Sequence, residues 1–151
     1  MTTIVYDHKN KEVACDSRYT RGDMIDTDEG DKTRKNDRGL WIFSGLVADY
    51  EDLMVLEKNE KAEVRPECCA ILISGGEAFT VDTDSEGFCI IDKLTSNFAA
   101  GSGANFGLVA LDFGKTAEEA VDYAKTRDSK SGGATRVFKL RDEENEYNTT
   151  K

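Results

Sequence analysis

The chain has 151 residues, of which 38% are hydrophobic and 33% are charged. This length suits one domain with a sizeable core, and we expect a single domain over residues 1–151. The composition excludes a disordered chain, and no apolar run is long enough to span a bilayer. The net charge of -10 argues against nucleic-acid binding, which needs clustered lysine and arginine.

The N-terminal residues lack a charged region followed by an apolar one, so we expect no signal peptide and a cytoplasmic location. In that reducing compartment the cysteines are expected to be buried small hydrophobes. The single histidine, His8, argues against histidine-dependent triads and against multi-histidine metal sites. We therefore expect no metal and no other cofactor. The cysteines are Cys15, Cys68, Cys69 and Cys89.

The first part of the chain predicts two hairpins and a helix. Residues 2–7 and 11–16 have the alternation of paired strands, with a polar turn between them. A loop with an extended piece around Met24 and Ile25 is expected next, and then a hairpin that ends at Ser44 and Gly45. After Gly45 the period changes to that of a helix ending near Asn59. The remaining predicted ranges are the loop 18–31, the strands 32–36 and 40–43, and the helical face Leu46, Tyr50, Leu53 and Met54.

The second part predicts three strands, two helices and a last strand. The run 69–74 is continuously apolar, as expected for a central strand covered on both faces. Thr116 and Glu119 form a capping box that starts the second helix. We expect the polar tail 141–151 to fray. The other predictions are strands 78–81, 88–91 and 135–140, a helix with the stripe Phe106, Val109, Ala110 and Phe113 capped by Gly114, and a helix with the buried stripe Ala117, Ala120, Val121 and Ala124.

This order of elements is strands, one helix, strands, two helices and a strand. Segregated runs of this kind indicate an α+β domain and not alternating βαβ units. Two stacked sheets between helical layers accommodate it.

The residues near the N-terminus carry the chemistry. Removal of Met1 would leave Thr2 with a hydroxyl nucleophile and an α-amine that serves as its base. A nearby lysine favours the neutral amine, and an aspartate keeps that lysine charged. The first hairpin brings Asp16 toward Thr2, and Lys32 is the candidate lysine. Each residue alone also has an ordinary explanation, such as a surface turn for Asp16 or a solvated strand end for Lys32.

Six segments in order resemble the proteasome β-type family, and especially the HslV branch of these N-terminal-nucleophile hydrolases. The resemblance implies a four-layer αββα sandwich. Its first helical layer would be reduced, because no second helix is predicted between residue 59 and Cys68. The segments are Thr2-Thr3-Ile4-Val5, Asp16-Ser17-Arg18, Lys32, Ser44-Gly45 with Ala48-Asp49, Gly101-Ser102-Gly103, and Arg127-Asp128-Ser129-Lys130-Ser131-Gly132-Gly133.

The resemblance also implies a role for each site residue. Thr2 would supply the nucleophile and the base, Lys32 would lower the pKa of the amine, and Asp16 would orient Lys32. The Gly45 N–H would stabilise the oxyanion. The remaining roles are a supporting hydrogen-bond shell of Ser102, Asp128 and Ser131, contact with the substrate backbone by Thr20, and a first specificity pocket lined by Tyr19, Phe43 and Val47. A bulky Phe43 at the pocket floor would favour small or medium side chains.

The resemblance thus implies a threonine-type endopeptidase that acts on peptides or unfolded proteins, provided that Thr2 has a free N-terminus. Its implied partners are further copies of the chain, in a ring or a smaller oligomer, and an ATP-dependent unfoldase. Two alternatives stay open: a catalytically silent binding or assembly protein with this fold, and an amidase acting on small amides. The reduced helical layer and a retained Met1 would favour the silent protein.

Overall fold

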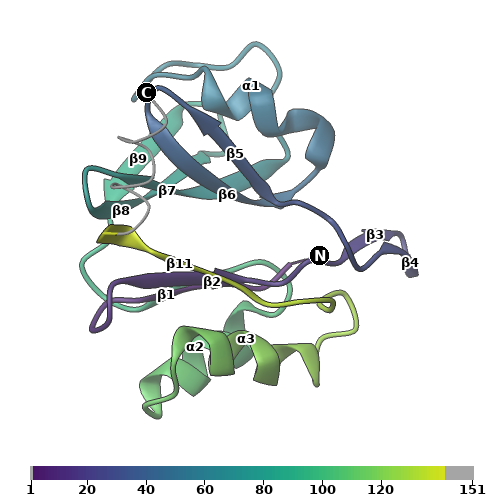
Figure 1. Ribbon diagram of the computed structural model, residues 1–151. Coiled ribbons are helices and arrows are strands. Elements are labelled where there is room, and N and C mark those ends of the chain that lie inside the picture. Colours follow the sequence, from purple (N-terminus) through teal and green to yellow (C-terminus); the bar gives the residue numbers. More distant parts are fainter. Residues whose placement is uncertain (1, 142–151) are drawn as a thin grey trace.

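In the computed structural model, which describes residues 2–141, two β-sheets lie between helices (Figure 1). One sheet has four strands in the order β10-β1-β2-β11, and the other has five in the order β5-β6-β7-β8-β9. This layered α+β architecture confirms the predicted fold class. The strands are β1 (Ile4–Asp7), β2 (Glu12–Cys15), β5 (Thr33–Asn36), β6 (Gly39–Gly45), β7 (Cys68–Ser74), β8 (Glu77–Thr83), β9 (Cys89–Lys93), β10 (Phe98–Ala100) and β11 (Arg136–Lys139).

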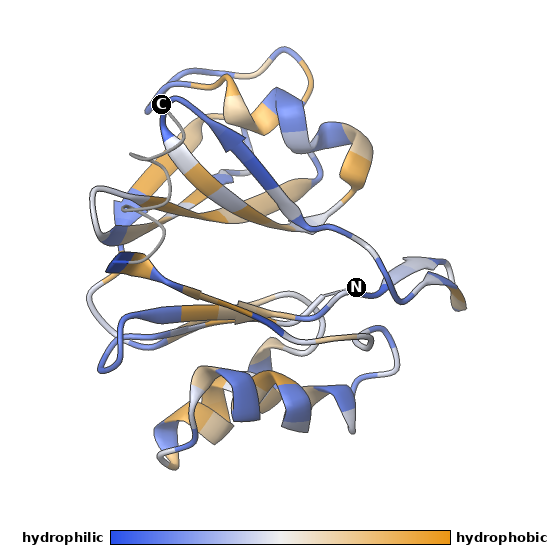
Figure 2. Cartoon of the chain, viewed as in Figure 1, coloured by the Kyte–Doolittle hydropathy of each residue, from blue (hydrophilic) through white to orange (hydrophobic). Residues whose placement is uncertain are grey.

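The four-stranded sheet packs on both of its faces. Helices α2 (Ala104–Asp112) and α3 (Ala117–Lys125) cover its outer face, where they contact β1 and β2. Val5 and Ala14 point to these helices, whereas Ile4 and Cys15 point into the core between the two sheets. Alternate side chains of β1 and β2 therefore belong to two different cores, one on each face of the sheet. The predicted pairing of these strands is confirmed, with Ile4 opposite Cys15. Figure 2 shows apolar residues along the strands of both sheets.

The five-stranded sheet has β7 at its centre, as its continuous apolar run predicts. Ile71 faces the core between the sheets, and Leu72 faces the opposite side. On that opposite side, Trp41 and Phe43 stack with ring centroids 5.8 Å apart, and Phe43 and Tyr50 stack at 4.2 Å. These aromatic rings fill the space below the short helix α1.

The helix expected to end near Asn59 is shorter than predicted. It consists of the 3-10 helix η1 (Val47–Asp49) followed by α1 (Tyr50–Met54). The prediction of its end is wrong because the segment beyond it makes non-local bonds: the Asn59 N–H donates to the carbonyl of Cys89 at 2.9 Å, and Asn59 has a φ of 69°. The outer layer over the five-stranded sheet is reduced in the described chain, as expected from the lack of a second predicted helix.

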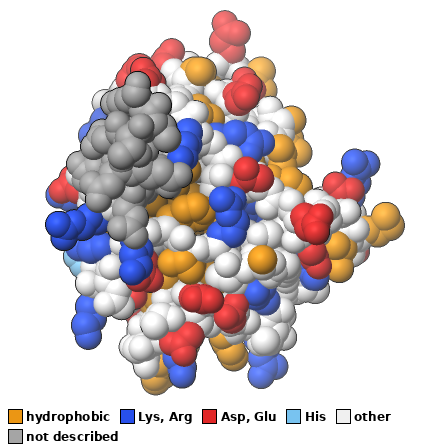
Figure 3. Space-filling model, viewed as in Figure 1, with side chains coloured by type: hydrophobic (Ala, Val, Ile, Leu, Met, Phe, Trp, Pro, Cys, Tyr) orange, Lys and Arg blue, Asp and Glu red, His pale blue; other side chains and the backbone are white. Residues whose placement is uncertain are grey.

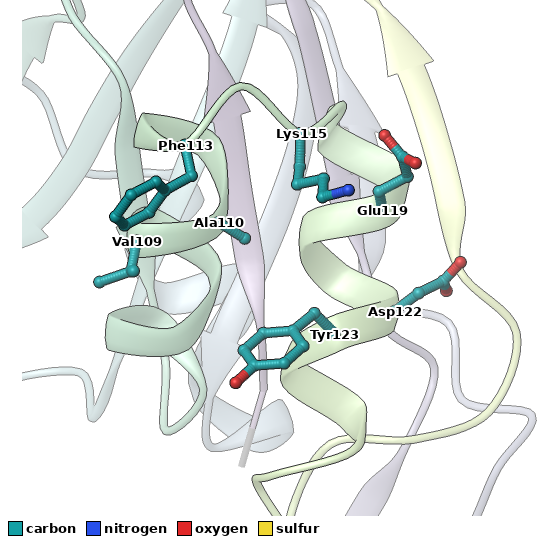
Figure 4. Close-up of a pocket in the computed structure, with 7 residues that line it drawn as sticks. All are labelled: Val109, Ala110, Phe113, Lys115, Glu119, Asp122 and Tyr123. Carbon is teal, nitrogen blue, oxygen red and sulfur yellow. The ribbon is translucent and has the colours of Figure 1, made fainter.

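Most of the apolar stripe predicted on α2 faces outward. Phe106, Val109 and Phe113 are 38%, 53% and 84% exposed, and of that stripe only Ala110 is buried. The helix packs on β1 through Gly107, which has no side chain. A Cβ at this position would lie only 2.6 Å from Cγ1 of Val5, so a larger residue would not fit there. Figure 4 shows Val109 on α2, Phe113 directly after α2 and Tyr123 on α3 around the resulting surface pocket. The buried stripe and the capping box predicted for α3 are both confirmed.

The predicted loop 18–31 contains a two-stranded sheet of β3 (Tyr19–Arg21) and β4 (Met24–Thr27), which turns at Gly22. This hairpin extends from the body of the molecule near the N-terminus (Figure 1). Strand β10 was not predicted at all, and it pairs with β1. The part of the tail 141–151 that follows Arg141 lies outside the described residues.

Among residues 2–141, no helix has the length and apolar character needed to cross a membrane. On the face in Figure 3, acidic and basic side chains are interspersed.

Candidate active site

The structure brings Thr2, Asp16 and Lys32 together at one end of the two sheets. Thr2 precedes β1, Asp16 follows β2, and Lys32 precedes β5. The Lys32 Nζ donates to Thr2 Oγ1 at 2.9 Å and to Asp16 Oδ1 at 2.7 Å. All three residues are at most 2% exposed. The arrangement is therefore a buried lysine shared between a hydroxyl and a carboxylate.

Asp16 is held by more than its ion pair. Its Oδ1 also accepts from the Thr3 N–H at 3.0 Å, and its Oδ2 accepts from the N–H groups of Gly132 at 2.9 Å and Arg18 at 3.3 Å. These hydrogen bonds replace the water that burial removes from the carboxylate oxygens. Asp16 thus fixes the position of Lys32 and also ties three backbone segments together.

Burial lowers the pKa of Lys32, and the charge of Asp16 opposes this effect. The ammonium group therefore sits where its proton is easier to lose than in water, although the carboxylate beside it favours the charged form. Because this cation donates to Thr2 Oγ1, it stabilises negative charge on that oxygen. It also disfavours protonation of an amine on the same residue.

A second group of polar residues lies on the other side of Thr2. The Thr2 backbone nitrogen donates to Ser102 Oγ at 3.2 Å. The hydroxyls of Ser102 and Ser131 each donate to Asp128 Oδ2 at 2.6 Å. Burial acts to raise the pKa of Asp128, but these hydrogen bonds outweigh it and hold the pKa below the ordinary value. The predicted supporting residues are thus brought into one network.

Ser102 reaches Thr2 because two glycines allow a close turn. Gly101 has a φ of 95°, and a Cβ there would lie 2.1 Å from the Thr2 carbonyl oxygen. The Gly103 N–H then donates to that same oxygen at 3.1 Å. Strand β10, which leads into this turn, is hydrogen-bonded to β1, so the turn is anchored beside Thr2.

A groove of about 310 Å³ opens at Thr2. Three of the expected binding residues line it, namely Tyr19, Thr20 and Val47, and so does Gly45. Gly45 has a φ of 119°, and a Cβ at this position would lie 2.4 Å from the carbonyl oxygen of Glu67. Only glycine therefore fits at this point of the groove wall. The other lining residues are Arg21, Asp26, Leu46, Ala48 and Tyr50.

Phe43 is not among the groove-lining residues, contrary to the expectation from the resemblance. It is fully buried between Trp41 and Tyr50, and Tyr50 lines the groove instead. The sequence predicts Tyr50 only as a member of one helical face, with no role in the site. Thr3 and Arg18 were also not assigned a role in the site, although both donate to Asp16.

The residues around Thr2 differ from those of a metal centre or a reactive cysteine site. Residues 2–141 contain no group of three histidine, cysteine or acidic residues that could hold a metal ion. The thiol nearest to the site in sequence is that of Cys15, and burial raises its pKa to about 12. A thiol with so high a pKa is almost never the reactive thiolate near neutral pH.

No protein-family model matches this chain, and no curated protein matches it significantly. Similar solved structures exist. Eukaryotic HslV from Trypanosoma brucei has a TM-score of 0.68 and 23% identity, and the match covers 90% of this chain and 97% of that one. BPH of Thiobacillus denitrificans, in a complex with epoxomicin, has a TM-score of 0.66 and 12% identity, with 91% and 97% covered. The chain thus has the fold of the HslV and proteasome β-type peptidases.

Two glycines with similar backbone angles provide a matched test of the turn beside Thr2. We expect Gly114→Ala to cost about 1 kcal/mol, since its φ of 91° disfavours alanine but nothing lies within 4 Å of the new Cβ. Gly101→Ala should cost at least about 2 kcal/mol more, because its Cβ would collide with Thr2. Urea unfolding of both variants measures the difference, and equal costs would contradict the close approach.

The carboxylate of Asp128 should make stability depend on pH. Its folded pKa lies below the ordinary value of 3.8, so its contribution is complete above pH 3.8 and is lost as the pH falls through the folded pKa. The difference in unfolding free energy between the wild type and Asp128→Asn should therefore shrink below that pH. Urea unfolding from pH 6 to pH 3 measures it. A difference that stays constant over this range would be evidence against the hydrogen-bonded carboxylate.

Proposed function

We propose that this chain is a threonine-type peptidase, in which Thr2 attacks the peptide bond once Met1 has been removed. The observation that carries this proposal is the buried Lys32, whose Nζ lies 2.9 Å from Thr2 Oγ1 and 2.7 Å from Asp16. A lysine in this position favours both the neutral amine and the developing alkoxide. It does so without a histidine, since His8 lies at the opposite end of β1 from Thr2.

In the proposed reaction, the α-amine of Thr2 takes the proton of its own hydroxyl as Oγ1 attacks the peptide carbonyl. The Gly45 N–H donates to the oxyanion of the tetrahedral intermediate, and one such donor is typically worth about 3–4 kcal/mol. The C–N bond then breaks, and the amine gives its proton to the leaving nitrogen. An ester on Thr2 remains, and water hydrolyses it by the same route.

The groove suits the side chain that precedes the cleaved bond. Its walls include the aromatic rings of Tyr19 and Tyr50 and the smaller Val47. Phe43 stacks on Tyr50 and does not itself line the groove. We propose that small or medium side chains bind here and that Thr20 contacts the substrate backbone. Unfolded proteins, delivered by an ATP-dependent unfoldase, are the substrate class that the resemblance implies.

A catalytically silent protein is the alternative that one observation favours. The helical layer over the five-stranded sheet contains only one short α-helix in the described chain. A shortened layer fits a protein that has lost part of an assembly surface, and a retained Met1 would block the amine of Thr2. An amidase for small substrates is the remaining alternative.

Intact-mass measurement with a threonine-directed epoxyketone, such as epoxomicin, tests the function. We expect the wild type to lack Met1 and to form one adduct. Thr2→Ala should form none and should lose peptidase activity by about three orders of magnitude or more, as is typical when a nucleophile is removed. Thr80→Ala is the matched control, because Thr80 lies on β8 and does not line the groove. This variant should behave like the wild type.

Two results would contradict the peptidase proposal in different ways. A mass that includes Met1, with no adduct, would favour the silent protein. Hydrolysis of small amides without hydrolysis of peptides would favour the amidase.

We also propose that the protein assembles with copies of itself through the outer face of α2 and α3. Phe113 is 84% exposed and, with Val109 and Tyr123, forms the apolar part of a surface pocket of about 480 Å³, so apolar and oppositely charged side chains share one surface. Lys115 lies at the same pocket as Glu119 and Asp122 (Figure 4). An interface between identical copies requires such self-complementarity, and large exposed apolar patches are uncommon on monomers.

Light scattering on the wild type should therefore give a mass of at least a dimer. Phe113→Glu should shift it toward the monomer, because the charge would be buried in the interface. The matched control is Val55→Glu, at an exposed position next to α1, which should leave the mass unchanged. A monomeric wild type, or equal masses for all three proteins, would contradict this interface.

A further inference from the structure

A short chain of hydroxyl groups runs from Thr2 through Asp128 to Thr3. We propose that Thr3 is a positioning residue for the reaction: it fixes the directions of the hydrogen bonds in this chain, so that the α-amine of Thr2 acts as a donor to Ser102. This inference rests on the proposed function, because it concerns the same nucleophile. Nothing in the resemblance assigns a role to Thr3.

The direction of each hydrogen bond follows from the carboxylate at the centre of the chain. An ionised carboxylate only accepts hydrogen bonds, so the two hydroxyls that lie 2.6 Å from Asp128 Oδ2 must both donate to it. These hydroxyls belong to Ser102 and Ser131. Each serine has one hydroxyl proton, and in both cases it is used on Asp128.

The two outer contacts are then determined as well. Thr3 Oγ1 lies 2.7 Å from Ser131 Oγ, and because the Ser131 proton is already used, Thr3 is the donor. The Thr2 nitrogen, a peptide N–H while Met1 precedes it, donates to Ser102 Oγ at 3.2 Å, and because the Ser102 proton is used on Asp128, the free amine would keep this direction. Both ends of the chain thus donate inward, toward Asp128.

This direction matters for the base. An amine that donates one of its protons to Ser102 keeps its lone pair for the proton of its own hydroxyl. If Ser102 rotated and donated to the amine, the lone pair would be occupied and the amine could not act as a base. The orientation of the Ser102 hydroxyl therefore decides whether Thr2 is active, and Asp128 sets that orientation.

Thr3 is built to hold the far end of this chain. It is fully buried and Ser131 is 1% exposed, so water does not replace the donor. Two glycines of the α2 region make room for its side chain: a Cβ on Gly103 would lie 1.9 Å from Thr3 Oγ1, and one on Gly107 would lie 3.5 Å from its methyl group. With Thr3 donating, Ser131 cannot rotate away from Asp128 without leaving a buried donor unsatisfied.

The kinetic test uses a double-mutant cycle between Thr3 and Ser102. Thr3→Val keeps the shape of the side chain but removes the donor, and we expect kcat to fall about tenfold with little change in KM, as for the loss of one buried hydrogen bond. Thr3→Ser keeps the hydroxyl and should restore kcat to within about twofold of the wild type. In a Ser102→Ala background, Thr3→Val should cause no further loss, because both changes act through one chain. Effects that multiply would overturn the inference.

A second double-mutant cycle tests the hydrogen-bond chain by protein stability and needs no enzymatic activity. The losses of unfolding free energy caused by Thr3→Val and Ser131→Ala should not add, since both remove the same hydrogen bond. Losses that add would overturn the inference even if the enzyme is active. A wild type that forms no epoxyketone adduct would contradict the proposed function instead. The unfolding cycle would then still test the hydrogen bond between Thr3 and Ser131.

Discussion

Lys32 carries a charge into a site that is almost closed to water, and the carboxylate of Asp16 compensates for it. The effective cost of burying a single ion is several kcal/mol, so the pair persists only if its remaining bonding capacity is satisfied. Asp16 meets this condition by accepting three backbone N–H groups besides Lys32. Those donors come from the segment just before β1, from the segment after β2 and from the loop after α3. The ion pair thus requires that all these segments meet at one end of the sheets.

Close backbone contacts allow the segments to meet. Gly101 touches the carbonyl of Thr2, and Gly132 lies so near Arg18 that a Cβ would be 2.4 Å from its Cζ. Arg18 in turn donates to the carbonyl of Ser129 at 2.9 Å, which secures the loop that carries Asp128. Glycines at these positions therefore allow the backbone segments of the site to approach one another, in addition to allowing the chain to turn.

The sequence predicted the features that depend on local patterns, but not those that depend on contacts between distant residues. The first hairpin, the central strand and the capped helix α3 follow from periodicity and capping, which are local. The orientation of α2 depends on Gly107 fitting against Val5 of β1, and the early end of α1 depends on Asn59 bonding to Cys89. Both contacts join residues far apart in the sequence, so the local sequence pattern does not predict them. For the site, the resemblance named residues that the structure brings together, but the exchange of Phe43 for Tyr50 in the groove wall arises from aromatic packing between β6 and α1.

The fold alone does not separate an active enzyme from a silent relative, because one fold serves many functions. The site gives a physical reason to favour activity. A buried ion pair is often no more stabilising than apolar residues of the same size. A chain that only binds a partner through its surface therefore gains little by keeping Lys32 and Asp16 buried beside a hydroxyl. The pair becomes useful when Thr2 has a free amine, since the same ammonium group then favours the neutral base and the attacking oxygen at once.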